Sequence, residues 1–283
     1  MINIPFNTSA SSMVYGKNLL ENAKRLADLV DNIEIILFST LNRNNIPDTN
    51  ELDLLRKLGR KKKVTFTVHL PASLEIASKD RKIREDSIRM VSKLCNHTAS
   101  IEPLHYILHV PFTTPTLVPV PGLYFKTDDG QNWGEWTRRG LEALERIFDT
   151  TPVAGKLLLE NINYSPYFLE PFFEEGQCEF CLDIGHLILG SENVNDALRC
   201  YQKEIRELHI HGVKGYEEHL SLSLLPVETV WEWMDFLIRI EFDGILNLEV
   251  FSPEDLTASL NTLAKALLHR KNRIAISPEF SDR

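Results

Sequence analysis

The chain has 283 residues, of which 43% are hydrophobic and 25% are charged, and its formal net charge is −9 with a pI near 5.5. This length fits one α/β barrel domain, and the acidic balance argues against nucleic acid, whose binding depends on neutralising many phosphates. No apolar run approaches the roughly 20 residues of a membrane-spanning helix, and the N-terminal residues lack the features of a signal peptide. We therefore expect a cytoplasmic protein that binds neither nucleic acid nor membranes.

Short runs typical of β-strands alternate along the chain with stretches of helical periodicity. The strands are expected, in order, at residues 2–6, 33–38, 63–70, 105–110, 156–162, 178–184, 207–213 and 245–250. Helical spacing of apolar residues is clearest at residues 18–30, 51–61, 86–95, 136–148, 230–240 and 255–270. Eight strands that alternate with about eight helices predict parallel β-α-β units.

A closed barrel and an open doubly wound sheet would both fit this order. No Gly-rich phosphate loop follows the first strand, and polar residues end nearly every strand instead of clustering at one point. Both features favour a (β/α)8 TIM barrel, with residues 1–272 as a single barrel domain and 273–283 as a C-terminal tail. A long segment without a predicted element, 111–132, is expected to form a lid over the barrel mouth.

Four cysteines are too few for a disulfide framework in a chain of this size. Cys178 and Cys181 have C-x-x-C spacing, but both fall in a predicted strand. Side chains at an odd offset on a strand point to opposite faces. We therefore expect buried structural thiols and not a redox or zinc pair.

Histidines and acids recur where the predicted strands end, and in a barrel these ends meet at one mouth. The candidates are His69, His109, Glu160, Asp183, His186, His209, His211, Glu217, Glu218, His219 and Glu249. The alternation of a strand places His209 and His211 on one face, and likewise Thr65, Thr67 and His69. The other histidines fit less well: His105 begins a strand at the opposite end, and His97 and His269 belong to helices. Glu34 could face the interior or form a salt bridge, and it stays unassigned.

Burying Glu160, Asp183 and Glu249 together would raise their pKa values or require compensating positive charge. The nearest cations in the sequence are Lys156 and Lys214. Divalent metal ions would supply the charge, and mixed imidazole and carboxylate ligands suit zinc, manganese or iron. The sequence therefore predicts a metal centre at the barrel mouth.

Six segments, VHLP, LENI, LDIGH, HIHG, EHLSL and LEVF, follow one another in register over nearly the whole chain. In this order they resemble the xylose isomerase-like TIM-barrel superfamily, which includes the zinc-dependent abasic-site endonucleases. Within it, IEIILF, TVHLP, CLDIGHLIL and LEVFSPEDLTASL look most like the cobamide-remodelling phosphodiesterases. That similarity implies hydrolysis of the nucleotide loop of a cobamide such as cobalamin, giving a corrinoid phosphate and the lower-ligand nucleoside.

The resemblance also implies a set of ligands for two or three metal ions per chain, with zinc favoured. Isomerase members use a quartet that matches Glu160, Asp183, His209 and Glu249, and the phosphodiester-cleaving members add positions matching His69, His109, His186 and His219. The endonucleases carry an aspartate where Glu217 stands, which leaves Glu217 or the adjacent Glu218 open as a ligand and puts the third metal in doubt. Glu160 and Glu249 are expected to bridge metals in catalysis. His211 has no ligand counterpart and is expected to contact phosphate.

Three alternatives stay open at this point. A sugar or sugar-phosphate isomerase or epimerase would need one metal and two carboxylates, but it leaves four histidines at the mouth unexplained. An abasic-site nuclease shares the metal set but conflicts with the acidic charge. A corrinoid-binding or metal-storage module would bind without cleaving a bond. The metal, the preferred substrate and the oligomeric state are not determined by the sequence.

Overall fold

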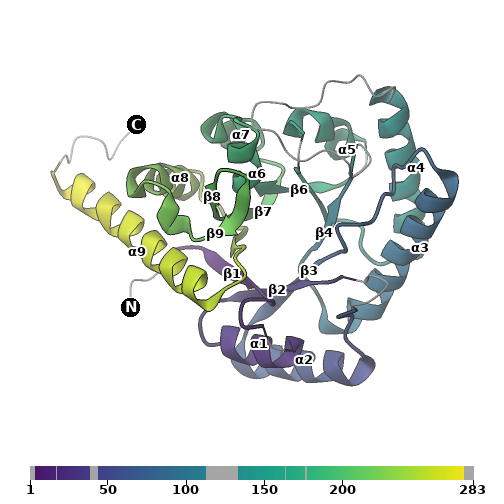
Figure 1. The fold of residues 1–283 in the computed structure, drawn as a ribbon, viewed down its shortest axis with the longest axis horizontal. Coiled ribbons are helices and arrows are strands. Elements are labelled where there is room, and N and C mark those ends of the chain that lie inside the picture. Colours follow the sequence, from purple (N-terminus) through teal and green to yellow (C-terminus); the bar gives the residue numbers. More distant parts are fainter. Residues whose placement is uncertain are drawn as a thin grey trace.

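The computed structural model describes residues 4–16, 18–38, 44–112, 133–162, 164–175 and 177–276, and most of the segment expected as a lid lies outside them. Eight parallel strands close into a barrel in the order β1-β10-β7-β6-β5-β4-β3-β2, with helices packed around it (Figure 1). The predicted (β/α)8 barrel is therefore confirmed. The strands are β1 (Asn7–Ser11), β2 (Asn32–Ile36), β3 (Thr65–His69), β4 (Tyr106–His109), β5 (Leu157–Glu160), β6 (Glu179–Asp183), β7 (Ile205–Ile210) and β10 (Ile245–Leu248).

Nine α-helices lie within the described ranges, and all six helices expected from periodicity are among them. They are α1 (Leu19–Leu26), α2 (Thr49–Lys62), α3 (Arg81–Thr98), α4 (Trp133–Thr150), α5 (Glu170–Glu174), α6 (Ile184–Leu189), α7 (Val194–Cys200), α8 (Val227–Arg239) and α9 (Pro253–Ile276). Helices α5, α6 and α7 have five to seven residues, which is too short to show periodicity in a sequence window. The boundary expected at residue 272 falls inside α9. Among the helices described, none combines the length and apolar character needed to span a membrane.

The prediction of a first strand at residues 2–6 is wrong, because residues 4–6 lie outside any strand and β1 is the polar segment Asn7–Ser11. Its side chains form hydrogen bonds where apolar residues were expected. Thr8 Oγ1 donates to Asp31 Oδ2 at 2.9 Å, and Ser9 Oγ donates to Asn32 Oδ1 at 2.9 Å. A strand that pairs its polar side chains inside a barrel lacks the β-branched pattern that identifies strands from sequence.

The two faces of the barrel strands differ in character. The outward face packs against helices: Phe66 on β3 lies so close to Gly59 of α2 that a Cβ added there would be 2.8 Å from its ring. The inward face is largely polar, although barrel interiors are usually filled by Val, Ile and Leu. Buried polar side chains inside the barrel include Ser9, Asn32, Glu34, Thr67, Glu207 and Asn247. The barrel axis is therefore hydrophilic beneath its mouth.

Cys178 and Cys181 are both buried. Cys178 belongs to the main hydrophobic core, whereas Cys181 forms a separate small cluster with Ile107 and Leu158. The predicted burial of both thiols is confirmed, although Cys178 directly precedes β6 and is not part of the strand.

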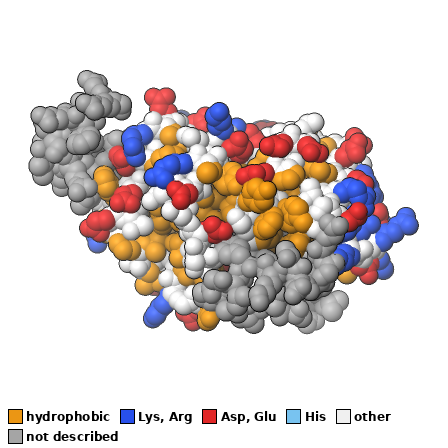
Figure 2. Space-filling view, turned by 90° about the horizontal axis from the view of Figure 1, so that it is seen from above, with side chains coloured by type: hydrophobic (Ala, Val, Ile, Leu, Met, Phe, Trp, Pro, Cys, Tyr) orange, Lys and Arg blue, Asp and Glu red, His pale blue; other side chains and the backbone are white. Residues whose placement is uncertain are grey.

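The segment after β7, expected as a loop, forms an antiparallel hairpin of β8 (Gly212–Lys214) and β9 (Glu217–Leu220). It is the green hairpin beside α6 in Figure 1. The molecular surface seen in Figure 2 carries hydrophobic side chains interspersed with acidic and basic ones.

Candidate metal centre

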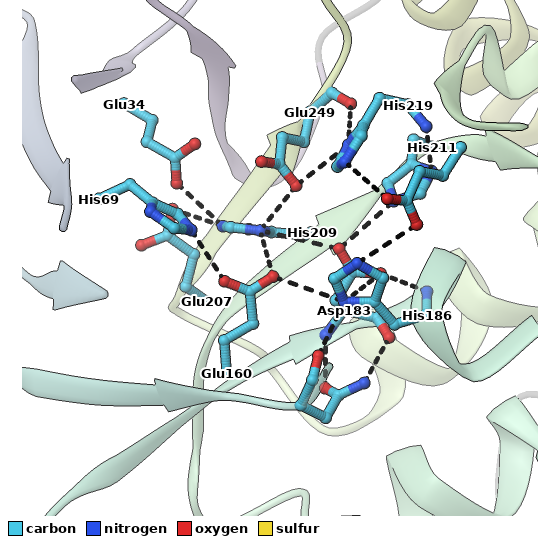
Figure 3. A network of polar contacts seen from close by, with 12 residues as sticks. Glu34, His69, Glu160, Asp183, His186, Glu207, His209, His211, His219 and Glu249 are labelled. Atoms are coloured by element: carbon cyan, nitrogen blue, oxygen red, sulfur yellow. Dashed lines mark hydrogen bonds and ion pairs between the residues drawn. The ribbon is translucent and has the colours of Figure 1, made fainter. Parts of the chain in front are cut away.

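The histidines and acids predicted from strand phase point toward one another at one end of the barrel (Figure 3). Parallel strands bring their C-terminal ends to the same rim, and His69, His109, Glu160 and Asp183 each end a strand. Several overlapping groups of side chains offer ligand atoms that lie within 4.8 Å of one another, among them Glu160, Cys181 and His209, and also His211, His219 and Glu249. Three further groups combine residues of the strand ends and the hairpin. We call them the two-histidine site (His69, His109 and Glu160), the carboxylate site (Glu160, Asp183, His209 and Glu249) and the hairpin site (His186, Glu218 and His219).

The two-histidine site is built around one carboxylate oxygen. Glu160 Oε2 lies 3.0 Å from Nε2 of His69 and 3.0 Å from Nε2 of His109. Strand pairing explains the meeting of the last two residues, because His109 on β4 is directly in register with Glu160 on β5. Glu160 belongs to the carboxylate site as well, so this residue can bridge two cations.

The carboxylate site surrounds Nδ1 of His209, which lies 3.0 Å from Glu249 Oε2, 3.3 Å from Glu160 Oε1 and 3.8 Å from Asp183 Oδ2. All four residues are buried. Within the described part of the chain, Glu249 Oε2, Asp183 Oδ2 and His209 Nδ1 have no hydrogen-bond partner of proper alignment. Buried polar atoms without partners are costly. A divalent cation held among them would satisfy all three, so this donor set fits a metal.

The hairpin site settles which of two neighbouring glutamates lies near the histidines. Glu218 Oε2 lies 3.5 Å from Nε2 of His186, and its Oε1 lies 3.7 Å from Nε2 of His219. Glu217 is exposed and falls outside the three groups defined above. Successive residues of a strand face opposite sides, so Glu218 takes the place for which Glu217 was a candidate.

Hydrogen bonds fix which ring nitrogen of each histidine faces the acids. Nδ1 of His69 lies 2.8 Å from the main-chain oxygen of Leu70, and Nδ1 of His186 lies 2.8 Å from that of Asn161. A carbonyl only accepts, so both Nδ1 atoms carry a proton and both Nε2 atoms face the acids, where they would offer lone pairs to a cation after losing their own protons. Histidines that bind metals usually donate their other N–H in this way.

The same rule extends to the two other histidines of these sites, although with different nitrogens. His219 directs Nδ1 at the main-chain oxygen of Glu249, 3.3 Å away, and so keeps Nε2 for the hairpin site. His209 is reversed and is held by an ion pair that lacks hydrogen-bond alignment: its Nε2 lies 2.9 Å from Oε2 of Glu34, and its Nδ1 faces the carboxylate site. Glu34, unassigned from the sequence, therefore orients a candidate ligand.

The acids and histidines of the centre shift one another's pKa values. Burial alone would raise the pKa of Glu160, but His209 and His109 outweigh it and hold the pKa well below its usual range. Burial lowers the pKa of His69, yet Glu160 reverses the effect and raises the pKa to about 9. Among the described residues, all ion partners within 4.0 Å of Glu160, Asp183 and Glu249 are histidines. Protons thus supply the compensating charge that metal ions would otherwise provide.

Sequence reasoning missed Glu207 and Asn161. Glu207 lies beneath the carboxylate site, where its Oε2 accepts a hydrogen bond from Thr67 Oγ1 across the barrel at 3.3 Å, and burial together with Glu34 raises its pKa well above the usual range. Its even offset from His209 could have revealed it. Asn161 holds the main chain of Asp183 with two hydrogen bonds, accepting from its N–H at 2.8 Å and donating to its oxygen at 2.9 Å. We see no sequence signal for that role.

Three histidines were expected to lie away from the centre. His97 directs Nε2 at the main-chain oxygen of Pro47, 2.7 Å away. His105 precedes β4, at the opposite end of that strand from His109, and burial lowers its pKa to about 4. The side chain of His269 lies outside the described residues.

Comparisons with known proteins place this barrel in a family. A family model described as xylose isomerase-like TIM barrel matches residues 20–270, whereas no curated protein matches. Among solved structures, the chain is similar to a D-tagatose 3-epimerase-like protein, with 18% identity, a TM-score of 0.76 and coverage of 95% of this chain and 100% of that one. It is also similar to the 3-keto-D-glucoside 4-epimerase YcjR from E. coli (11%, TM-score 0.69, 93% and 99% covered). A third similar structure is SacUVDE, with 13% identity, a TM-score of 0.62 and coverage of 94% of this chain and 99% of that one.

Identities this low show a common fold and do not transfer an activity. One of the three is named as a sugar epimerase and another as a protein like one, which agrees better with the alternative of a sugar isomerase or epimerase than with a cobamide phosphodiesterase. The resemblance to the superfamily is confirmed, and the finer resemblance to cobamide-remodelling enzymes stays a prediction. On the match over residues 20–270, the chain belongs to the xylose isomerase-like TIM-barrel family.

Proposed function

We propose that this protein is a metal-dependent phosphodiesterase that works with two or more divalent cations, zinc being the first candidate. The observation that carries the proposal is the pair of ligand groups joined at Glu160, with the hairpin site beside them. An isomerase that uses one cation needs only the carboxylate site, so His69, His109, His186 and His219 would not be required as metal ligands in it. When bound, divalent cations supply Lewis-acid charge that activates water and neutralises a phosphate group.

The side chains at the barrel mouth could bind an anion only together with divalent cations. Glu160, Asp183, Glu218 and Glu249 would repel a phosphodiester by themselves. The Nε2 atoms of the surrounding histidines would hold cations in place, and Glu160 and Asp183 are themselves buried. In the proposed hydrolysis, water adds to phosphorus and one P–O bond breaks, so that the phosphate stays on one product and the other leaves as an alcohol.

A cobamide is the substrate that we propose within this class, on the strength of the sequence resemblance. Two observations support a small molecule with apolar surface. Tyr167, Tyr216 and Phe251 are 63%, 57% and 43% exposed and follow β5, β7 and β10, at the same end of the barrel as the metal centre. On the face shown in Figure 2, Lys and Arg side chains lie among acidic ones without forming a continuous basic surface for nucleic acid.

A sugar epimerase is the second candidate, because the similar solved structures include such an enzyme and an epimerase-like protein. Glu160 and Glu249 both approach Nδ1 of His209, at 3.3 and 3.0 Å. Two carboxylates around a single cation could remove a proton from a sugar carbon and return it. This function would require one cation per chain.

One experiment separates the two candidates. Protein loaded with Zn²⁺ or Mn²⁺ is incubated with cobalamin and, separately, with D-tagatose and D-fructose, and the products are identified by mass spectrometry and sugar chromatography. We expect a corrinoid phosphate, a released nucleoside and at least two metal ions per chain by elemental analysis. Glu160→Gln should abolish the release, whereas Lys214→Ala, an exposed change on the hairpin, should not. Epimerised sugar with one metal ion per chain would overturn the proposal.

A further inference from the structure

His211 is a buried histidine at the barrel mouth whose ring is bound differently from those of His69 and His186, although one of its nitrogens also lies within ligand distance of His219 and Glu249. Its exposed fraction is 0%, and its ring lies against Gly185, where an added Cβ would be 1.9 Å from Cε1 and 2.3 Å from Nε2. A side chain enclosed in this way has no free face for a substrate phosphate, which was its expected partner. Its function must therefore act through its neighbours.

The two ring nitrogens of His211 meet protein groups of opposite kinds. The main-chain N–H of His219 donates to Nδ1 at 2.9 Å, and Nε2 lies 3.3 Å from Oδ2 of Asp183. An accepting Nδ1 requires that the proton be on Nε2, where it faces the carboxylate of Asp183. In the candidate ligands His69 and His186 the arrangement is the reverse, with a proton on Nδ1 and with Nε2 directed at the acids.

The main-chain oxygen of Gly212 offers a competing partner, 3.2 Å from Nδ1 of His211. A proton on Nδ1 would suit this oxygen, but it would oppose the N–H of His219 and leave that N–H without an acceptor. The lone pair of Nε2 would then face the oxygen of Asp183. Only the ring with its proton on Nε2 accepts the bond from His219 and also places an N–H beside Asp183 Oδ2, which it attracts electrostatically without an aligned hydrogen bond.

The N–H that His211 accepts belongs to a residue with an unusual backbone. His219 has a φ of +56°, the left-handed region that side chains other than glycine rarely adopt. Such a conformation persists only when the surroundings hold it. The bond to Nδ1 of His211 is a contact that can hold it, and the conformation directs the His219 ring at Glu218 in the hairpin site.

We propose that His211 is a positioning residue, neither a metal ligand nor a substrate contact, that ties the left-handed His219 and the whole β8–β9 hairpin to Asp183. This inference rests on the metal centre proposed above. Through its two nitrogens, the ring connects a ligand of the carboxylate site with a ligand of the hairpin site. The hairpin site should then depend on a residue that never touches its cation.

Two substitutions test the roles of the two ring nitrogens of His211 one at a time. In His211→Gln, the amide nitrogen can replace Nε2 and donate to Asp183, but no acceptor remains for His219. In His211→Asn, the side-chain oxygen can replace Nδ1 and accept from His219, but the donor to Asp183 is lost. We expect His211→Gln to weaken the binding of one Zn²⁺ per chain by roughly 10- to 100-fold, the usual effect of losing a hydrogen bond behind a ligand. His211→Asn and the exposed control Lys214→Ala should keep that ion.

The protonation and metal binding of the His211 ring are measured by NMR of wild-type protein labelled with ¹⁵N-histidine, first without metal and then with ¹¹³Cd²⁺. We expect His211 to carry its proton on Nε2 in both states and to show no coupling to cadmium. Coupling of His211 to cadmium, a proton on Nδ1, or His211→Gln that binds Zn²⁺ as tightly as wild type would overturn the inference. Wild-type protein that binds no metal would refute the proposed function, while the position of the proton in the metal-free protein would still decide the role of His211.

Discussion

Gly185→Ala is the substitution whose effect follows most directly from the packing at the barrel mouth. Gly185 lies in the first turn of α6, and its added Cβ would be 1.9 Å from Cε1 of His211. The ring would have to withdraw by roughly 1.5 Å to reach an ordinary carbon contact. That movement takes Nε2 out of reach of Asp183, 3.3 Å away, and disturbs the bond from the N–H of His219.

The expected loss of stability combines three contributions. Forcing a group into a packed site costs about 1–3 kcal/mol, and leaving buried hydrogen-bonding groups without partners costs about 1–3 kcal/mol. Alanine is favoured over glycine in a helix by about 1 kcal/mol, which offsets part of this cost. We expect the free energy of unfolding to fall by about 3 kcal/mol, which lowers the melting temperature by roughly 6–12 °C.

The assay is thermal and urea unfolding of metal-free protein, so that metal binding does not contribute. The control is the same change in a His211→Ala background, where the ring that meets the new methyl group is gone. In the His211→Ala background, Gly185→Ala should be neutral or stabilising by about 1 kcal/mol. The double-mutant cycle should then give a coupling free energy of roughly 3–4 kcal/mol between the two positions. An equal loss of stability in both backgrounds would refute the reasoning, because the clash would then not be with His211.

Three further predictions concern His105, the metal and Glu34. Burial lowers the pKa of His105 to about 4, so the unfolded chain binds the extra proton between its ordinary pKa of about 6.5 and pH 4. Wild type should therefore lose up to about 3 kcal/mol of stability as pH falls through that window. In His105→Gln this pH-dependent loss of stability should be absent, as measured by urea unfolding at pH 5 and 7.5. A variant with the same pH dependence as wild type would contradict the prediction. Removing the metal with a chelator should lower the free energy of unfolding by about 2.7 kcal/mol for each site at which the free metal concentration had been 100 times the Kd. Calorimetric scans check this, and equal melting temperatures before and after chelation would count against a bound metal. Glu34→Gln removes the anionic partner of His209 Nε2, 2.9 Å away. Competition with a chromophoric chelator should show affinity at the carboxylate site reduced by roughly 10- to 100-fold, and unchanged affinity would exclude this role.

Much of the candidate site could be predicted from the sequence because two simple geometric rules operate there. Alternation along a strand placed His209 and His211 on one face, and the common direction of parallel strands brought His69, Glu160 and Asp183 to one rim. These rules need only the strand positions. They failed at β1, where Ser9 and its neighbours bury polar side chains and so lack an apolar signal.

By itself, then, the sequence determined the barrel, its strand order along the chain and the set of acids and histidines at its mouth. The tertiary structure decided what each of these side chains does there. Whether Glu217 or Glu218 turns inward depends on the path of the β8–β9 hairpin and on the left-handed backbone of His219. Which nitrogen of His211 carries the proton depends on an N–H eight residues away and on a carboxylate from another strand. Such roles arise from contacts between distant segments, and neither residue type nor spacing encodes them.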